Sequence, residues 1–469
     1  MAKIDESASN VWMPRLPEGG GPLYLAIADA LAADIATGQL TNGTRLPPQR
    51  TLAHRLGIDF TTVSRAYAEA RRRGLVEARV GMGTFVLRSE RAAEAATPAP
   101  SGLVDLTMNF PPRSGDGPLS QSLWAAVADL EHSGGMDLLL RYQEVGGTRA
   151  DREAGAVWLG DMVPELGAER LILAPGAQAG LLALLTLLKV DQRPVAVEAL
   201  CYPGFRALAD HKATPLVPVA MDSDGLIPED FAAQCARHRP ALLYCTPNLH
   251  NPTTATMPLA RREAIAAIAR EYDVIILEDD AYGKLAGNGL PPLAALAPER
   301  TYHIASLSKS LAPALRLAYV ACPDARSAAR LTGAIRATTS MASPLGAAIA
   351  TRWIGSGLAA QTLAAIQTEA EARRAMALRH LGQDGMQSAR HAYHIWLPLG
   401  HGWRRGDLAS RLRQSGIGVV TSDAFAIGPA PEAIRIGLAA APDRATLENS
   451  LREIADLVCQ PPLLGNLIV

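Results

Sequence analysis

The sequence predicts an α/β protein in two parts: a small helical unit at the N-terminus, and a large domain built on a mostly parallel sheet with helices on both faces. Three observations support this prediction. At 469 residues, the chain is too long for one ordinary domain. Its first ninety residues show helical spacing of apolar residues, interrupted by glycines. From Leu171 onward, short apolar runs alternate with longer helical patterns, which is typical of parallel strands joined by helices.

The charge of the chain is balanced overall but not locally. The net charge is −1 at pH 7, which by itself gives no sign of a nucleic-acid partner. Between residues 45 and 88, however, nine arginines stand against Asp59, Glu69 and Glu77. A local excess of positive charge attracts phosphates. The N-terminal unit is therefore the part in which we expect nucleic-acid binding.

The cysteines and the apolar runs exclude several other classes. The five cysteines are odd in number and show no CxxC spacing, so we expect neither a disulfide framework nor a metal site. The chain shows no basic-then-apolar leader and no uninterrupted apolar run long enough to span a membrane. We therefore expect a cytoplasmic protein.

Local signals divide the N-terminal unit into three helices and a hairpin. Pro47 can occupy a first helical turn, Gly57 suits a helix end, and Asp59 or Thr61 can cap the next helix. The inward stripe of the third helix is predicted at Val63, Ala66, Tyr67 and Ala70. The predicted elements are helices over 22–38, 46–56 and 59–74 and strands over 75–80 and 84–87.

A helix, a glycine turn, a second helix and a hairpin in this order form a helix-turn-helix with a wing. Together with Leu46-Pro47, Leu56-Gly57 and Gly81-Met82-Gly83-Thr84-Phe85, the segment resembles the winged helix-turn-helix of GntR-type regulators. Asp59-Phe60 departs from the Ser-Arg that is common in that family. Alternatively, the arginines belong to a solvated helix face. The resemblance implies DNA contacts from Arg50, Thr61, Thr62, Ser64, Arg65 and Arg79.

A linker is predicted between the two parts. The segment after residue 88 is rich in alanine and charge, ends in alternating prolines and shows no hydrophobic period. At ~3 Å per residue, it could span at most about 50 Å. The two parts therefore stay close enough for a change in one to affect the other. The predicted boundaries are a DNA-binding domain over 1–88, a linker over 89–104 and a large domain over 105–469.

Alternating strands and helices organise the large domain. Sheets of this kind bind ligands at the carboxyl ends of their strands. Polar motifs follow several of the predicted strands, so we expect the site at that edge. The predicted strands are 171–173, 195–197, 242–244, 274–277 and 316–321, and the predicted helices include 179–188 and 259–272.

One lysine stands among small hydroxyl residues directly after the strand-like run 302–305. Lys309 lies in Ser306-Leu307-Ser308-Lys309, so desolvation should lower its pKa toward the range in which a free amine attacks a carbonyl. Ser306, Ser308 and Arg316 can bind a phosphate. An aldehyde cofactor with a phosphate, pyridoxal 5'-phosphate, fits these groups. The alternative is a surface lysine at a strand-to-helix turn.

Four further motifs lie at the same expected edge. Gly176 starts a helix whose N–H groups can face an anion. Tyr202 can stack on a ring, and Asn251 stands in an Asn-Pro-Thr motif. Asp279 and Tyr282 follow an apolar strand, where a buried carboxylate needs a cationic partner such as a protonated pyridine.

The order of these motifs resembles class I aminotransferases of fold type I over roughly 330 residues, which implies a smaller α+β subdomain at the C-terminus. By that likeness, Lys309 forms the Schiff base, Asp279 pairs with the ring nitrogen and Tyr202 stacks on the ring. Asn251 and Tyr282 bind the phenolate oxygen. Arg435 binds a ligand carboxylate. The implied phosphate ligands are Gly176, Ala177, Gln178, Ser306, Ser308 and Arg316, with Tyr142 from a neighbouring subunit.

A GntR-type domain ahead of an aminotransferase-like domain resembles the MocR/GabR-type transcriptional regulators. The likeness implies a homodimer that binds operator DNA and senses an amino-group ligand, or pyridoxal phosphate itself, through the Lys309 Schiff base. The rival hypothesis is an active aminotransferase with a DNA-binding appendage, because Lys309, Asp279 and Tyr282 supply its catalytic groups.

Overall fold

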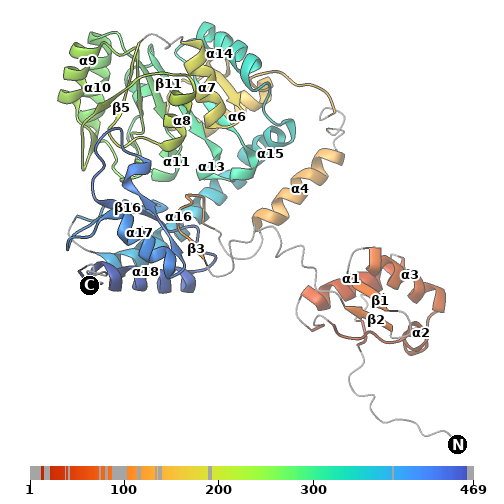
Figure 1. Ribbon diagram of the computed structural model, residues 1–469. Helices are drawn as coiled ribbons and strands as arrows, with labels where there is room; N and C mark the ends of the chain where they lie inside the picture. Colours follow the sequence, from red (N-terminus) through yellow and green to blue (C-terminus); the bar gives the residue numbers. More distant parts are fainter. Residues whose placement is uncertain are drawn as a thin grey trace, which may run out of the picture. The chain divides into compact units, whose positions relative to one another are not determined.

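The computed structural model describes residues 12–14, 22–36, 39–40, 43–72, 75–79, 83–86, 103–112, 118–132, 135, 140–188, 193–382 and 385–461. The chain forms two compact units, Met1–Ala99 and Pro100–Val469 (Figure 1). The segment 89–102 of the predicted linker, the helix end at Gly74 and the wing tip at Gly81 and Met82 lie outside the described residues.

The first unit packs its helices around one small core, which includes Ile27, Leu31 and the predicted stripe of the third helix. Leu23, at the start of the first helix, has an exposed side chain. Gly57 ends the second helix at φ +65°, a conformation that favours glycine. The elements are α1 (Leu23–Ala36), α2 (Gln49–Leu56), α3 (Phe60–Arg72), β1 (Val76–Arg79) and β2 (Gly83–Val86).

In this unit, the structure decides between the two predicted caps and corrects one predicted helix start. Asp59 rather than Thr61 caps α3, because Oδ1 of Asp59 accepts a hydrogen bond of 2.7 Å from the Thr61 backbone N–H. The second helix begins at Gln49 and not at Leu46, because residues 43–46 pair with β2. The backbone N–H of Leu46 donates to the Thr84 carbonyl over 2.9 Å. The wing hairpin of β1 and β2 is antiparallel, as predicted.

A seven-stranded sheet organises the second unit, in the order β4-β12-β11-β10-β9-β5-β6. Every neighbouring pair is parallel except the two that involve β12. The strands are β4 (Leu171–Ala174), β5 (Val195–Glu198), β6 (Leu216–Val219), β9 (Leu242–Cys245), β10 (Ile275–Asp279), β11 (Thr301–Ser306) and β12 (Ala318–Ala321). A short antiparallel hairpin of β7 (Met221–Asp222) and β8 (Gly225–Leu226) follows β6 in the sequence.

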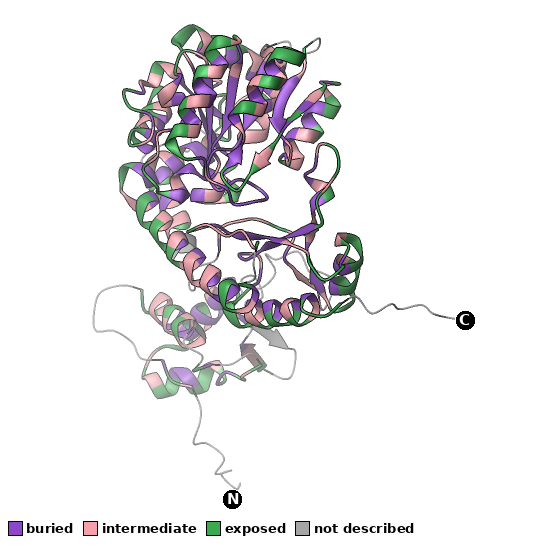
Figure 2. Cartoon of the chain, turned by 90° about the vertical axis from the view of Figure 1, so that its left-hand side faces the viewer, coloured by how far each residue is buried: buried purple, intermediate pink, exposed green. Residues whose placement is uncertain are grey.

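Helices cover both faces of this sheet (Figure 1), and its strands are buried (Figure 2). Alternate strand residues face opposite sides: Leu173 packs with α6 and α15, whereas Ile172 packs with α7 and α14. The helices are α4 (Pro118–His132), α6 (Arg149–Leu159), α7 (Ala177–Leu187), α8 (Pro203–His211), α9 (Pro228–His238), α10 (Leu259–Glu271), α11 (Gly283–Ala286), α12 (Leu293–Leu296), α13 (Leu307–Ser310), α14 (Ala325–Thr338) and α15 (Pro344–Gly355), with 3₁₀ turns at Ala168–Arg170 and Pro313–Leu315.

A smaller α+β subdomain follows, as predicted. Its antiparallel sheet has the order β13-β16-β15, and its core is separate from those of the large sheet. The N-terminal segment of the unit joins this subdomain, because β3 pairs in parallel with β14. The elements are β3 (Val104–Asp105), α16 (Leu358–Leu381), β13 (His394–Pro398), α17 (Arg405–Gln414), β14 (Ile417–Gly418), β15 (Val420–Thr421), a 3₁₀ turn at Ser422–Ala424, β16 (Ala433–Gly437) and α18 (Arg444–Val458).

The start of β12 differs from the prediction. Arg316 was expected inside this strand, but it follows the 3₁₀ turn Pro313–Leu315 at φ +52°, and the strand begins at Ala318. Because β12 is antiparallel to its neighbours, its amino end lies at the edge where the parallel strands have their carboxyl ends. Arg316 therefore reaches the expected edge by a turn. No helix of the described segments is long and apolar enough to cross a membrane.

Candidate functional site

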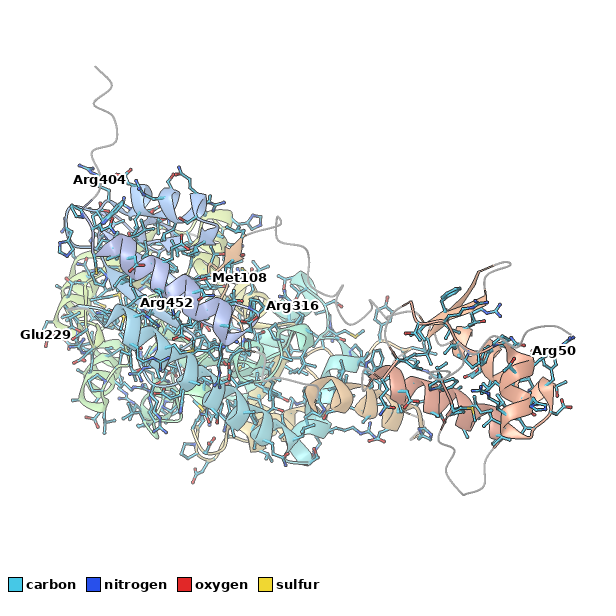
Figure 3. All side chains as sticks on the ribbon, turned by 90° about the horizontal axis from the view of Figure 1, so that it is seen from below. Arg50, Met108, Glu229, Arg316, Arg404 and Arg452 are labelled. Atoms are coloured by element: carbon cyan, nitrogen blue, oxygen red, sulfur yellow. The ribbon has the colours of Figure 1, made fainter. Side chains whose placement is uncertain are left out.

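A cavity of about 590 Å³ lies at the carboxyl edge of the large sheet. Two residues of its lining, Met108 and Arg316, are labelled near one another in Figure 3. The residues that line the cavity come from six strand ends of the large sheet, from residues 107–109 and from the smaller subdomain. All predicted cofactor and ligand residues except Tyr142 line it, namely Gly176, Ala177, Gln178, Tyr202, Asn251, Asp279, Tyr282, Ser306, Ser308, Lys309, Arg316 and Arg435.

One end of the cavity is suited to an anion. Gly176 precedes α7 at φ +91°, and within the described residues no side chain caps this helix. The first N–H groups of a helix have no partner inside it and carry a partial positive charge. The Ser306 hydroxyl accepts from the Ser308 backbone N–H over 3.2 Å, so its own proton can be donated to a ligand. These groups and Arg316 fit a phosphate.

Lys309 lines the cavity with a primary amine, a group that can act as a nucleophile. It lies on the short helix α13, and its Nζ donates to the backbone carbonyl of Asn109. Burial lowers the pKa of Lys309 to about 8, and the nearby Arg435 charge acts in the same direction. About a tenth of the amine is therefore uncharged at pH 7, far more than for an ordinary lysine, and attack on an aldehyde requires this form.

Asp279 is the last residue of β10, and only one of its two carboxylate oxygens has a hydrogen-bond partner among the described residues. Oδ2 accepts a hydrogen bond of 2.8 Å from the Tyr244 hydroxyl. Oδ1 is buried and has no hydrogen-bond partner among the described residues. Burial raises the pKa of Asp279 to about 6, although the Tyr244 hydrogen bond opposes this shift. An unpaired buried carboxylate oxygen is what a protonated pyridine nitrogen would satisfy, so the site fits the predicted cofactor.

The Tyr282 hydroxyl is oriented by a chain of side chains. Nδ2 of Asn109 donates to the Tyr282 oxygen over 2.7 Å and lies 3.0 Å from Nδ1 of His394. Burial lowers the pKa of His394 to about 3, so its ring is neutral, with Nδ1 as acceptor and Nε2–H facing the His250 carbonyl at 3.2 Å. Because Tyr282 accepts from Asn109, its own proton can be donated into the cavity.

Arg435 lies on β16, almost wholly buried. Its Nη1 donates to Oδ1 of Asn251 over 2.7 Å, and its Nη2 donates to the Thr107 carbonyl. The guanidinium carbon lies 5.2 Å from the centre of the Phe425 ring. Nε has no partner in the described part of the chain. The guanidinium thus retains a donor for a carboxylate.

Several residues of the site were not predicted. Tyr244 was read only as a strand residue, although it stands at the same sheet edge as Asp279. Asn109 and Thr107 reach the cavity through a segment with no recognisable motif. His394 and Phe425 come from the smaller subdomain. Only Tyr244 carried a usable signal, as a polar aromatic residue within a predicted buried strand.

The remaining predicted residues lie elsewhere. Tyr142 is 93% exposed and does not line the cavity of its own chain. In the first unit, Arg50, Thr61 and Arg65 are exposed. The guanidinium of Arg65 lies 4.3 Å from the centre of the Tyr24 ring. Thr62 and Ser64 are half-buried, and the side chain of Arg79 lies outside the described residues. Within the segments searched, no His, Cys, Asp and Glu side chains gather as a metal site would require.

Comparisons with known proteins match both units. Residues 101–454 match the family model of aminotransferase class I and II, and residues 23–86 match that of the gntR family of bacterial regulatory proteins. The HTH-type transcriptional regulator YdeF of Bacillus subtilis is 33% identical over 314 residues, which cover 66% of this chain and 67% of that protein.

Two further relatives are named for vitamin B6 metabolism. The pyridoxine biosynthesis transcriptional regulator PdxR of Corynebacterium glutamicum is 30% identical over 64% of this chain and 66% of its own. The vitamin B6 salvage pathway transcriptional repressor PtsJ of Salmonella typhimurium is 27% identical over 64% of this chain and 68% of its own.

Solved structures share the fold of the second unit. The kynurenine aminotransferase of Pyrococcus horikoshii has a TM-score of 0.70 at 20% identity, covering 79% of this chain and 96% of its own. The α-aminoadipate aminotransferase LysN of Thermus thermophilus has a TM-score of 0.68 at 22% identity, covering 76% of this chain and 92% of its own.

Proposed function

Because the chain belongs to the aminotransferase class I and II family and carries a GntR-family domain ahead of it, we propose that it is a pyridoxal phosphate-dependent transcriptional regulator. In this proposal the first unit binds double-stranded operator DNA, and the second unit senses a small molecule. The observation that carries it is a cavity, in one chain with a GntR-family domain, that is lined by a partly buried lysine and by a buried carboxylate with an unpaired oxygen.

The chain's own residues would hold the cofactor at four points. The start of α7 with Ser306, Ser308 and Arg316 binds the phosphate. Oδ1 of Asp279 accepts from the ring nitrogen, Tyr202 covers one face, and Asn251 with Tyr282 meets the phenolate oxygen. When bound, the cofactor supplies an aldehyde that exchanges covalently between Lys309 and a ligand amine. The roles of Gly176, Ala177 and Gln178 follow from their place at the start of α7.

The ligand of this site is an amino compound with a carboxylate. Arg435 is positioned to bind the carboxylate, because its Nε is unpaired within the described segments. A ligand amine that takes the place of Lys309 would release the lysine. The shift of the protein between two arrangements is limited by the ligand's differential affinity for them. In a second form of this proposal, pyridoxal phosphate is itself the effector and no amino compound is needed. The names of PdxR and PtsJ favour this form.

The regulator works as a cytoplasmic homodimer in this proposal. Tyr142 is exposed and would reach the phosphate site of a partner subunit. A dimer presents two winged helices and would therefore bind paired half-sites.

A second candidate function is transamination, because Lys309, Asp279 and Tyr282 all line one cavity. Lys309 could then move a proton as well as hold the cofactor. Steady-state turnover with pairs of amino and oxo acids decides between the two. A rate within the ordinary enzyme range of ~1–1000 per second would make the chain an enzyme.

The experiment that tests the regulator combines colour and DNA binding. The purified chain should show a visible absorbance band with pyridoxal phosphate, and Lys309→Ala should lose it. The band should change when the right amino compound is added, and the affinity for selected DNA duplexes should change with it. A colourless chain, or one that binds no duplex, would overturn the proposal.

A further inference from the structure

The first described segment of the second unit packs on the smaller subdomain and lines the cavity before the chain reaches the large sheet. The backbone N–H of Leu106 donates to the Gly418 carbonyl over 2.8 Å, next to the pairing of β3 with β14. The Gly437 N–H donates to the Leu106 carbonyl over 2.8 Å. A Cβ on Gly437 would lie 2.5 Å from the Met108 carbonyl oxygen, so backbone packs directly on backbone here.

Three consecutive residues of this segment, Thr107, Met108 and Asn109, then line the cavity. Their backbone carbonyls hold both of its functional cations. The Asn109 carbonyl accepts from Nζ of Lys309, and the Thr107 carbonyl accepts from Nη2 of Arg435. The Asn109 side chain also donates to the Tyr282 hydroxyl. The segment therefore contacts the same three groups that the proposed cofactor and ligand would use.

These contacts compete with ligand binding. Lys309 as an ammonium ion has three hydrogens to donate, whereas a Schiff-base nitrogen has at most one. Its bond to the Asn109 carbonyl is therefore lost or redirected. A carboxylate that binds the guanidinium edge with the unpaired Nε also uses a hydrogen of Nη2, so it becomes a second acceptor on the nitrogen that donates to the Thr107 carbonyl.

We propose that residues 106–109 form a strap that reports the state of the cavity to the DNA-binding domain. The two carbonyl bonds hold the strap against Lys309 and Arg435. Covalent capture of Lys309 takes away the donor to the Asn109 carbonyl, and carboxylate binding places a second acceptor on Nη2 of Arg435 beside the Thr107 carbonyl. The strap then shifts and displaces the chain that leads to residues 1–99. This inference rests on the proposed function, because it needs a cofactor at Lys309.

The strap can be loosened outside the cavity. Oδ1 of Asp105 accepts from the Thr107 backbone N–H over 2.9 Å and also from the Thr107 hydroxyl, which fixes the turn that aims the Thr107 carbonyl. Asp105 does not line the cavity. Asp105→Ala removes this acceptor, whereas Asp105→Asn retains an oxygen in its place and serves as the matched control.

The test uses the full chain, pyridoxal phosphate, the standard amino acids added singly, and DNA duplexes selected from a randomised library. Asp105→Ala should still develop the visible band and bind the selected duplex. The change in DNA affinity on adding cofactor and amino acid, typically 5–150-fold for coupled sites, should fall to about 1-fold in Asp105→Ala. Asp105→Asn should keep it.

Hydrogen exchange of the wild-type chain supplies a second readout that needs no variant. Amide exchange within residues 103–112 should rise when cofactor and amino acid are bound, whereas β13 should not change. A chain that takes up no cofactor would defeat the proposed function itself. The wild-type chain could instead bind cofactor and amino acid with unchanged exchange in 103–112, while Asp105→Ala gives the same DNA response as the wild type. That result would contradict the strap proposal but not the proposal that the protein is a regulator.

Discussion

At the scale of single residues, the proposed function depends on two ionisable groups whose charged forms are destabilised by burial. The amine of Lys309 and the carboxyl of Asp279 both line the cavity, and desolvation is the largest cause of both pKa shifts. The direction of each pKa shift predicts how a measurable property changes with pH: the rate of cofactor uptake for Lys309, and the free energy of unfolding for Asp279.

Cofactor uptake should follow the titration of Lys309. Its pKa is lowered from 10.5 to about 8, and only the free amine attacks an aldehyde. The rate of appearance of the visible band should therefore fall about tenfold per pH unit below pH 8 and level off above it. Stopped-flow absorbance measures this rate, with Lys309→Ala as the control. A profile that still rises steeply up to pH 10 would contradict the lowered pKa.

The stability of the cofactor-free chain should depend on Asp279. Its pKa is raised from 3.8 to about 6, so the stability associated with this group is complete below pH 3.8 and is lost as the pH rises through 6. Asp279→Asn keeps an oxygen acceptor for Tyr244 and removes the charge. At pH 8 it should raise the free energy of unfolding by on the order of 3 kcal/mol. Urea unfolding at pH 8 and at pH 4.5 checks this, since the gain should largely vanish at the lower pH.

At the scale of elements, one helix of each unit gives a testable prediction, α3 for DNA binding and α6 for stability. The recognition helix α3 opens with Phe60, which is 43% exposed and has the Arg50 guanidinium carbon 5.9 Å from its ring centre. Residues at this end of a recognition helix contact base edges. An aromatic side chain there suits the methyl group of thymine.

Phe60→Ala should therefore reduce the binding free-energy preference for one thymine in each half-site by about 1–3 kcal/mol. Duplexes with uracil in place of that thymine lack only the methyl group. They should bind the wild-type chain more weakly than the thymine duplex, and the Phe60→Ala chain equally well. If uracil weakens both proteins alike, Phe60 does not contact the methyl group.

Helix α6 packs on the sheet through a glycine. A Cβ on Gly155 would lie 2.5 Å from the Tyr319 ring and 2.6 Å from a Leu171 methyl group. Gly155→Ala should therefore destabilise the second unit by about 1–3 kcal/mol, despite the better helix propensity of alanine. Gly333→Ala on α14 is the matched control, because no described atom lies within 4 Å of its Cβ. That change should stabilise by up to about 1 kcal/mol, and thermal unfolding compares the two.

At the scale of the whole molecule, the proposed function assigns DNA binding to one compact unit and sensing to the other. The two compact units, Met1–Ala99 and Pro100–Val469, each have their own core. A chain that lacks residues 1–99 should keep the visible band and lose all DNA binding and promoter regulation. Spectrophotometry, duplex binding and a promoter reporter measure these properties. Regulation that persists in the shortened chain would show that the first unit is not the DNA-binding part.

The sequence by itself determined the features that depend on local pattern. Glycine stops, caps and helical spacing predicted the winged helix-turn-helix, and hydroxyl residues around Lys309 predicted a desolvated amine. These predictions work because helix ends and strand alternation are set by residues a few positions apart.

Only the tertiary structure decided which groups meet across the chain. The Asn109 carbonyl faces Lys309 across 200 positions, and the Thr107 carbonyl faces Arg435 across 328. Residues 43–46 pair with β2 by backbone hydrogen bonds, and Arg316 reaches the cavity through a left-handed turn. A backbone carbonyl is the same in every residue, so no side-chain pattern marks the one that will accept a bond. The path of the folded chain places Thr107 and Asn109 against the two cations, and sequence spacing does not encode that path.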